Sequence, residues 1–143
     1  TRVFFHRAET TMLSSGQDLP PEYDAKIRMM ESFSPRTLNN DKFCADWIEM
    51  FTMWPITSTP GLRTQLNVAP LESRLPAYRS ITTPALVLGF TDDVVLPAYL
   101  GAEVAEAMPN ARYLEIPDTG HLGFIEKPDV VNDAMLEFFA GRM

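Results

Sequence analysis

The sequence predicts an α/β protein built on a parallel sheet. Residues 85–90 form a short, unbroken apolar run, which is typical of a strand buried on both faces. Residues 112–116 alternate as a second strand, and residues 98–108 between them carry apolar side chains at helical spacing. Parallel strands need a long crossover connection, so the strand, the helix and the second strand form one α/β unit.

A second helix is expected after this unit. Asp129 occupies a position suited to an N-cap, and the helix that follows it would bury Val131, Met135 and Phe138. Gly141 is expected to end that helix, because glycine readily adopts the left-handed backbone conformation found there. A loop over residues 117–128 therefore separates the second strand from the last helix.

The first 80 residues differ from the rest in charge and in pattern. They hold equal numbers of basic and acidic residues, whereas residues 81–143 carry the whole net charge of −7. Residues 22–33 and 39–54 are predicted to be helices, and prolines separate them from their neighbours. We expect short helices with ordered loops and no strands over 1–80, and a second part over 81–143.

Composition excludes several classes of protein. The chain has 143 residues with 45% hydrophobic content, which is enough for a real core, and its single cysteine, Cys44, cannot form a disulfide scaffold. The acidic excess argues against nucleic acid as a partner. No apolar run approaches the ~18 to 20 residues of a membrane span. No charged-then-apolar leader opens the chain, so we expect a cytoplasmic protein without membrane association.

The sequence also predicts that the chain is part of a larger fold. It begins at Thr1 rather than at an initiator methionine, and the second part supplies only two strands. A two-stranded parallel unit is not expected to be stable alone. These observations favour a piece of a larger fold.

Few side chains are candidates for acid–base chemistry. The chain has two histidines, and His6 is expected to be a solvated or capping residue. His121 follows the second strand, and Asp92 and Asp93 follow the first. The carboxyl ends of parallel strands are where open α/β sheets place their sites, so one of these acids can reach the imidazole. A lone loop histidine is more often structural, but its pairing with acids at the end of a neighbouring strand favours catalysis.

Residues 81–143 resemble the last two strands and helices of the α/β-hydrolase fold. The resemblance rests on residues 84–92, Pro97, residues 116–121 and residues 126–128. In that family the catalytic acid follows the glycine by three positions, which implies Asp92 rather than Asp93 as the acid and His121 as the base. Residues 1–80 look like the helical cap, or lid, that such enzymes insert before the penultimate strand.

One part of the family's pattern is missing. The nucleophilic serine of the family sits in a Gly-x-Ser-x-Gly turn ahead of the cap, and no such motif occurs in this sequence. The resemblance therefore implies the C-terminal half of a hydrolase. Its partner would be an N-terminal half on another chain, carrying the serine and the other strands, with the two halves derived from a cleaved precursor.

The implied activity is Ser-His-Asp cleavage of an ester, thioester or lactone. The family needs no cofactor, and two histidines with one cysteine leave no metal-ligand cluster to propose. A small hydrophobic substrate is expected, with Trp54, Leu122 and Phe124 lining its pocket. The spacing of Phe43, Trp47, Met50, Phe51 and Trp54 is also typical of the packed face of a cap helix.

Other functions remain open at this level. A cofactorless oxygenase or haloperoxidase could use the same acid–histidine pair on the same fold. The fold also hosts ligand receptors that catalyse nothing. An N-terminal-nucleophile hydrolase using Thr1 is disfavoured, because such enzymes are built on stacked antiparallel sheets and residues 1–80 predict none.

Overall fold

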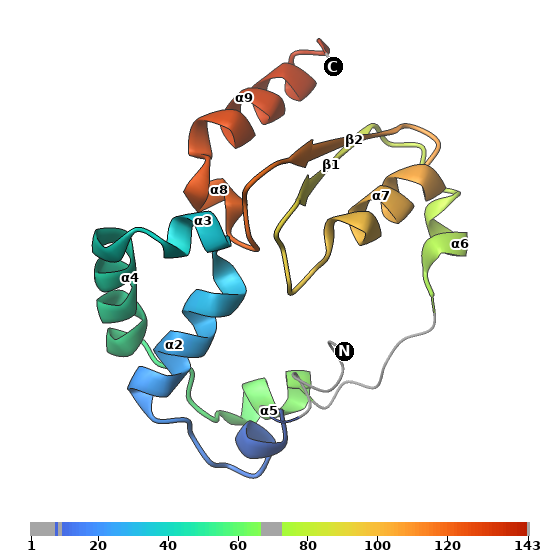
Figure 1. The fold of residues 1–143 in the computed structure, drawn as a ribbon. Coiled ribbons are helices and arrows are strands. Elements are labelled where there is room, and N and C mark those ends of the chain that lie inside the picture. The colour runs from blue at the N-terminus through green and yellow to red at the C-terminus, as the bar shows by residue number, and fades with distance from the viewer. Residues whose placement is uncertain (1–7, 9, 67–72, 143) are drawn as a thin grey trace. The chain divides into compact units, whose positions relative to one another are not determined.

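The computed structural model of the chain describes residues 8, 10–66 and 73–142. The chain forms two compact units (Figure 1). The first comprises the described residues of 1–29 and 42–71, and the second comprises 30–41 with those of 72–143. Residues 30–41 thus pack with the C-terminal unit, and the predicted division into a cap over 1–80 and a core over 81–143 remains a prediction.

Helices account for the regular structure described within residues 1–80. Both predicted helices are present, each within two residues of the expected bounds at either end: α2 covers Pro21–Ser32 and α4 covers Asp41–Met53. Shorter helices that the sequence did not predict include α3 (Pro35–Leu38), α5 (Pro60–Leu66) and α6 (Leu75–Tyr78). Each has a proline in its first two positions, where the missing N–H costs nothing because no helical acceptor faces it.

The first unit packs around a buried ion pair on α2. Asp24 is fully buried and accepts from Arg28 at 3.3 Å. The Arg28 guanidinium lies 4.0 Å from the centre of the Phe51 ring and donates to the Trp54 carbonyl at 2.8 Å. Along α4, the rings of Trp47 and Phe51 meet edge to face at 5.4 Å. The helical spacing of these aromatic residues therefore reflects packing between α2 and α4.

The second unit contains the predicted α/β unit. Strands β1 (Ala85–Phe90) and β2 (Ala111–Ile116) pair in parallel, in register from Ala85 opposite Ala111 to Phe90 opposite Ile116. Helix α7 (Ala98–Ala107) crosses between them and packs on both strands. Figure 1 shows α7 on one side of the strands and α9 on the other. The predicted strand–helix–strand order is confirmed.

The last helix begins earlier than predicted. Helix α9 covers Pro128–Phe139, with Lys127 at the N-cap position, so the prediction of Asp129 as the cap is wrong. Pro128 takes the first helical position because its fixed φ angle suits it, and this places Asp129 inside the first turn. Gly141 follows the helix at φ +69°, as expected of a glycine that ends a helix.

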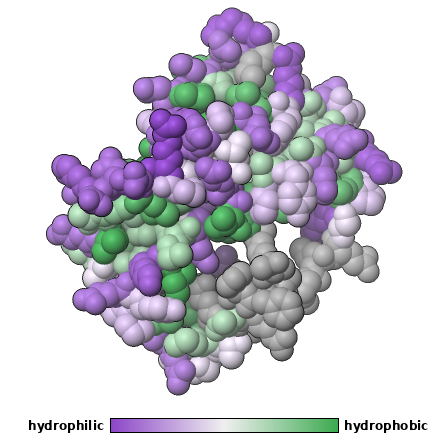
Figure 2. All heavy atoms as spheres, in the orientation of Figure 1, coloured by the Kyte–Doolittle hydropathy of each residue, from purple (hydrophilic) through white to green (hydrophobic). Residues whose placement is uncertain are grey.

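Burial along α9 is only partly as predicted. Val131 is buried and Phe138 is half-buried, whereas Met135 is exposed. Apolar side chains reach the surface elsewhere too, and Figure 2 shows some of them among polar ones on one face. In the second unit the large exposed apolar residues are Ile81, Val94, Leu96, Tyr99, Phe124, Val130, Met135, Leu136 and Phe139, together with Met30.

Tyr113 lies close against the β1 backbone. A Cβ atom added at Gly89 would lie 2.2 Å from the Tyr113 hydroxyl oxygen, so a side chain at position 89 would displace the Tyr113 ring. That hydroxyl group lies 2.8 Å from Glu115 Oε2 and 3.0 Å from the Ala98 carbonyl oxygen. Burial, followed by the hydrogen bond to Glu115 and that group's negative charge, raises the pKa of Tyr113 to about 12.

Candidate active site

The loops that follow β1 and β2 are joined by backbone hydrogen bonds. Thr91 N–H donates to the Ile116 carbonyl at 3.2 Å, and Asp92 N–H donates to the Thr119 carbonyl at 2.9 Å. These bonds extend the pairing of the strands beyond their ends. They bring the acidic loop after β1 against the loop that carries His121.

An acid–histidine pair lies at this edge of the sheet. His121 Nδ1 lies 2.9 Å from Asp93 Oδ2. Asp93 is only 7% exposed, and its other oxygen accepts from the backbone N–H groups of Val95 and Leu96 at 2.8 and 2.7 Å. The carboxylate is therefore fixed by two amides while it faces the imidazole.

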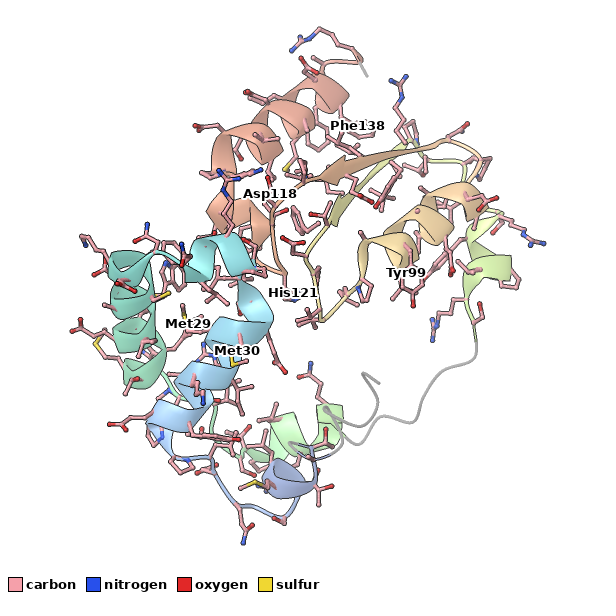
Figure 3. All side chains as sticks on the ribbon, in the orientation of Figure 1. Met29, Met30, Tyr99, Asp118, His121 and Phe138 are labelled. Atoms are coloured by element: carbon pink, nitrogen blue, oxygen red, sulfur yellow. The ribbon has the colours of Figure 1, made fainter. Side chains whose placement is uncertain are left out.

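The imidazole itself is partly open to solvent. The His121 side chain is 34% exposed, and Figure 3 shows it in the loop beyond the ends of the strands. When Nδ1 carries the proton and donates to Asp93, Nε2 has a free lone pair. This is the tautomer in which a histidine acts as a general base.

Asp93, and not Asp92, is the acid that faces His121, so the choice of Asp92 is corrected. Asp92 N–H is held by Thr119, while Asp93 N–H turns back to the Phe90 carbonyl at 3.2 Å. This tight turn directs the Asp93 carboxylate to the imidazole. A count of positions from Gly89 could not reveal these backbone bonds.

The His121 loop is anchored by a carboxylate that the sequence analysis gave no role. Glu126 is the last residue of α8 (Gly123–Glu126), a short helix that was not predicted. Its Oε2 accepts from Gly120 N–H at 2.5 Å, and its Oε1 accepts from the Ser34 hydroxyl at 2.6 Å and from Ser34 N–H at 3.0 Å. The signal that could have located this residue is its place in the Glu-Lys-Pro motif that resembles the family.

The three predicted pocket residues differ in their surroundings. Leu122 is half-buried beside His121, and its N–H donates to the Ser32 carbonyl at 2.8 Å. Phe124 is 51% exposed on α8. Trp54 belongs to the first unit, where its side chain is 67% exposed. Their role in binding substrate remains a prediction.

A hollow of about 330 Å³ adjoins the acid–histidine pair. His121 and Asp93 lie on its wall, and the rest of the lining is almost entirely apolar. Successive residues of β1 contribute to it, so it follows the edge of β1 that has no partner strand among the described residues. The lining residues are Val87, Leu88, Gly89, Phe90, Asp93, Leu96, Ala98, Leu100, Gly101, Val104 and His121.

The described part of the chain holds neither a metal-ligand cluster nor a membrane-spanning helix. Within residues 8, 10–66 and 73–142, no three His, Cys, Asp or Glu side chains lie close enough together to hold a metal ion. None of the helices in those residues combines the length and the apolar content that crossing a bilayer requires.

The fold and the site define an α/β protein with an acid–histidine pair at the carboxyl ends of its strands. Residues 3–134 match the model of the alpha/beta hydrolase family, and the chain belongs to that family. The predicted fold class and the predicted family are both confirmed.

The chain is similar to several relatives of known name. A Mycobacterium tuberculosis protein provisionally named non-heme bromoperoxidase BpoC is 63% identical over 97% of this chain and 53% of its own length. The crystal structure of BpoC matches with a TM-score of 0.89 at 61% identity, over 99% of this chain and 53% of that one. A carbamate hydrolase named provisionally as RutD, from Azorhizobium caulinodans, is 33% identical over 55% of this chain and 31% of its own length.

The chain spans about half the length of these curated M. tuberculosis relatives.

Proposed function

We propose that this chain supplies the acid and the general base of a serine-type hydrolase that cleaves a carbonyl compound. The observation that carries the proposal is the 2.9 Å contact between His121 Nδ1 and the buried, amide-anchored Asp93. A carboxylate in that position fixes the imidazole tautomer and stabilises the cation formed when the ring accepts a proton. The substrate class is an ester, thioester or lactone with a hydrophobic group.

The serine belongs to a complementary half that this chain assembles with. Its hydroxyl would attack the substrate carbonyl carbon while His121 Nε2 takes the proton. His121 would then return that proton to the leaving group as the acyl-serine forms. Water, deprotonated by the same imidazole, would hydrolyse the acyl-serine and restore the enzyme.

The edge of β1 supports the idea of a complementary half. A two-stranded parallel sheet does not stand alone, and an unpaired edge presents backbone donors and acceptors to a further strand. In the described residues β1 pairs only with β2, and the apolar hollow follows its other side. A strand from the complementary half would satisfy this edge and enclose Asp93.

The test is turnover of an activated ester by the assembled protein. His121→Asn should lower kcat by about 10⁶-fold, leaving only the ~10³-fold acceleration over water that binding and oxyanion stabilisation supply. Equal turnover by wild type and His121→Asn would reject the proposal. A complementary polypeptide that copurifies with the chain and contains Gly-x-Ser-x-Gly would identify the nucleophile by sequence.

The hydrophobic pocket forms a separate part of the proposal. Leu122 and Phe124 follow His121 by one and three positions, and both would offer apolar surface to a substrate. Trp54 would contribute from the cap. Trp54→Ala should lower kcat/KM for long-chain esters more than for short-chain ones. Equal losses on both would instead indicate that Trp54 serves packing.

Bromide oxidation is a second candidate, favoured by the name of the 63% identical relative. The same acid–histidine pair could catalyse this reaction if hydrogen peroxide, rather than water, attacks the acyl-serine. The acyl group would then be released from the serine as a peracid. The peracid would transfer one oxygen atom to bromide, with a proton, giving hypobromous acid and the carboxylic acid. Bromination of an activated diketone that requires peroxide and a carboxylic acid, and that is lost in His121→Asn, would support this function.

A further inference from the structure

We infer that Glu126 is the positioning residue that holds His121 in line with Asp93, an inference that rests on the proposed function. The residue does not touch the imidazole. It acts on the backbone immediately before it, through the hydrogen bond from Gly120 N–H to Oε2 at 2.5 Å. The other oxygen binds Ser34, so the carboxylate joins the His121 loop to residues 33 and 34.

The surroundings of Gly120 show how little freedom this loop has. Gly120 is buried, and a Cβ atom placed on it would lie 2.6 Å from the Phe33 carbonyl carbon and 2.8 Å from Ser34 N. The backbone of the His121 loop therefore rests directly on the backbone of residues 33 and 34. Contact this close requires that the polar groups on both sides be satisfied, because water cannot enter between them.

Glu126 satisfies those groups from both sides. It accepts three hydrogen bonds, one from Gly120 N–H and two from the N–H and hydroxyl of Ser34, which is itself fully buried. Without the carboxylate, the Gly120 and Ser34 N–H groups would lose the acceptor that the fold provides. A buried donor left without a partner is unfavourable, so the loop would move to find another acceptor.

Two further contacts fix the same loop to the same segment. Leu122 N–H donates to the Ser32 carbonyl at 2.8 Å, and Arg36 lies 3.6 Å from Asp118. Asp118 has a positive φ angle of 53°, which is strained for a residue with a side chain. The anchors therefore lie on both sides of His121, with Glu126 bonding the residue next to it.

Chemistry limits what can replace the carboxylate. Glutamine keeps the shape of the side chain, but one of its two terminal atoms becomes an NH₂ donor. Whichever way the amide faces, that donor meets either Gly120 N–H or Ser34 N–H, and one of the bonds is lost. Glu126→Gln is therefore a shape-conserving test of the acceptor function alone.

The experiment uses the assembled protein with histidine ¹⁵N-labelled in this chain. The His121 Nδ1–H signal, assigned by its absence from His121→Asn, reports the bond to Asp93 directly. We expect Glu126→Gln to weaken this signal or shift it upfield, and to lower kcat by about 10²-fold with little change in KM, as for a reacting group moved by about 1 Å. Glu106→Gln, at an exposed position on α7, is the matched control and should leave both readouts unchanged.

Each outcome decides one claim. A Glu126→Gln protein with the His121 signal and kcat of the Glu106→Gln control would overturn the positioning role. If Glu126→Gln does not fold, Ser34→Ala takes its place, because it removes the hydroxyl group that donates to Glu126 at 2.6 Å. This variant should shift the His121 Nδ1–H signal in the same direction. An unmoved signal would overturn the positioning role of Glu126. Failure of the proposed function would appear differently, as undiminished turnover in His121→Asn.

Discussion

Gly120→Ala is the substitution whose effect the structure allows us to work out most fully. The added Cβ would lie 2.6 Å from the Phe33 carbonyl carbon, whereas ordinary contact begins at 3.4 Å. The backbone on one side must therefore move by about 0.8 Å, the difference between these distances. Neither side offers a flexible side-chain end that could yield, because the atoms in contact belong to the main chain.

This displacement falls one residue before His121. Transmitted in full, it would lengthen the Nδ1–Oδ2 distance from 2.9 Å to about 3.7 Å, beyond the ~3.2 Å limit of a hydrogen bond. We expect kcat to fall by about 10²-fold. Overpacking of this kind should also lower the free energy of unfolding by about 1–3 kcal/mol.

The assay is turnover of an activated ester by the assembled protein, with urea unfolding measured on the same samples. Gly61→Ala is the matched control: Gly61 lies in helix α5, and nothing lies within 4 Å of its added Cβ. That variant should keep wild-type kcat and gain up to about 1 kcal/mol, because alanine favours a helix over glycine. Wild-type kcat in Gly120→Ala would refute the reasoning, since the contact would then not reach His121.

Three further predictions follow from the site and its surroundings. Asp93→Asn should lower kcat by about 10⁴-fold, because an amide that donates to Nδ1 favours the wrong tautomer of His121. Asp92→Asn, measured alongside, should keep most of the activity. A larger loss of kcat in Asp92→Asn than in Asp93→Asn would show that Asp92 is the acid. Tyr113 should ionise near pH 12 by ultraviolet absorbance. The raised pKa means that folding favours the neutral Tyr113 phenol. This contribution to the free energy of unfolding is complete below pH 10 and is lost as the pH rises toward 12. Urea unfolding of Tyr113→Phe at successive pH values should lack that part of the alkaline loss of stability. Thr119→Val should destabilise the protein by about 0.5–1.5 kcal/mol in the same assay. The buried hydroxyl donates to the Ile116 carbonyl at 2.8 Å, and that carbonyl keeps the Thr91 N–H as a second donor. No change in stability would mean that the hydroxyl bond is unimportant.

The strands and long helices could be predicted because their signals are local. The apolar run at 85–90 and the alternation at 112–116 each specify a strand, and parallel pairing follows from the helix between them. The short helices were missed because four to seven residues carry too little periodicity to stand out. The N-cap of the last helix was predicted two residues late, because an aspartate is a common cap while Pro128 in fact takes the first helical position.

The sequence was enough to predict which loops form the site, but not which side chains in those loops contact one another. Both loops follow parallel strands, so their meeting is a consequence of topology. The choice between Asp92 and Asp93 depends on a turn closed by the bond from Asp93 N–H to the Phe90 carbonyl. The role of Glu126 depends on Ser34, ninety-two positions away, and no local pattern reports such a contact.

The central claim is that His121, paired with Asp93, activates a serine on the complementary half. Labelling of the assembled protein by a fluorophosphonate probe, followed by mass spectrometry, tests it most directly, because the probe reacts with an activated serine and needs no knowledge of the substrate. We predict that the probe labels the serine of a Gly-x-Ser-x-Gly motif on the complementary half, and that His121→Asn and Asp93→Asn slow the labelling strongly. Absence of labelling, or an equal rate in both variants and wild type, would contradict the claim.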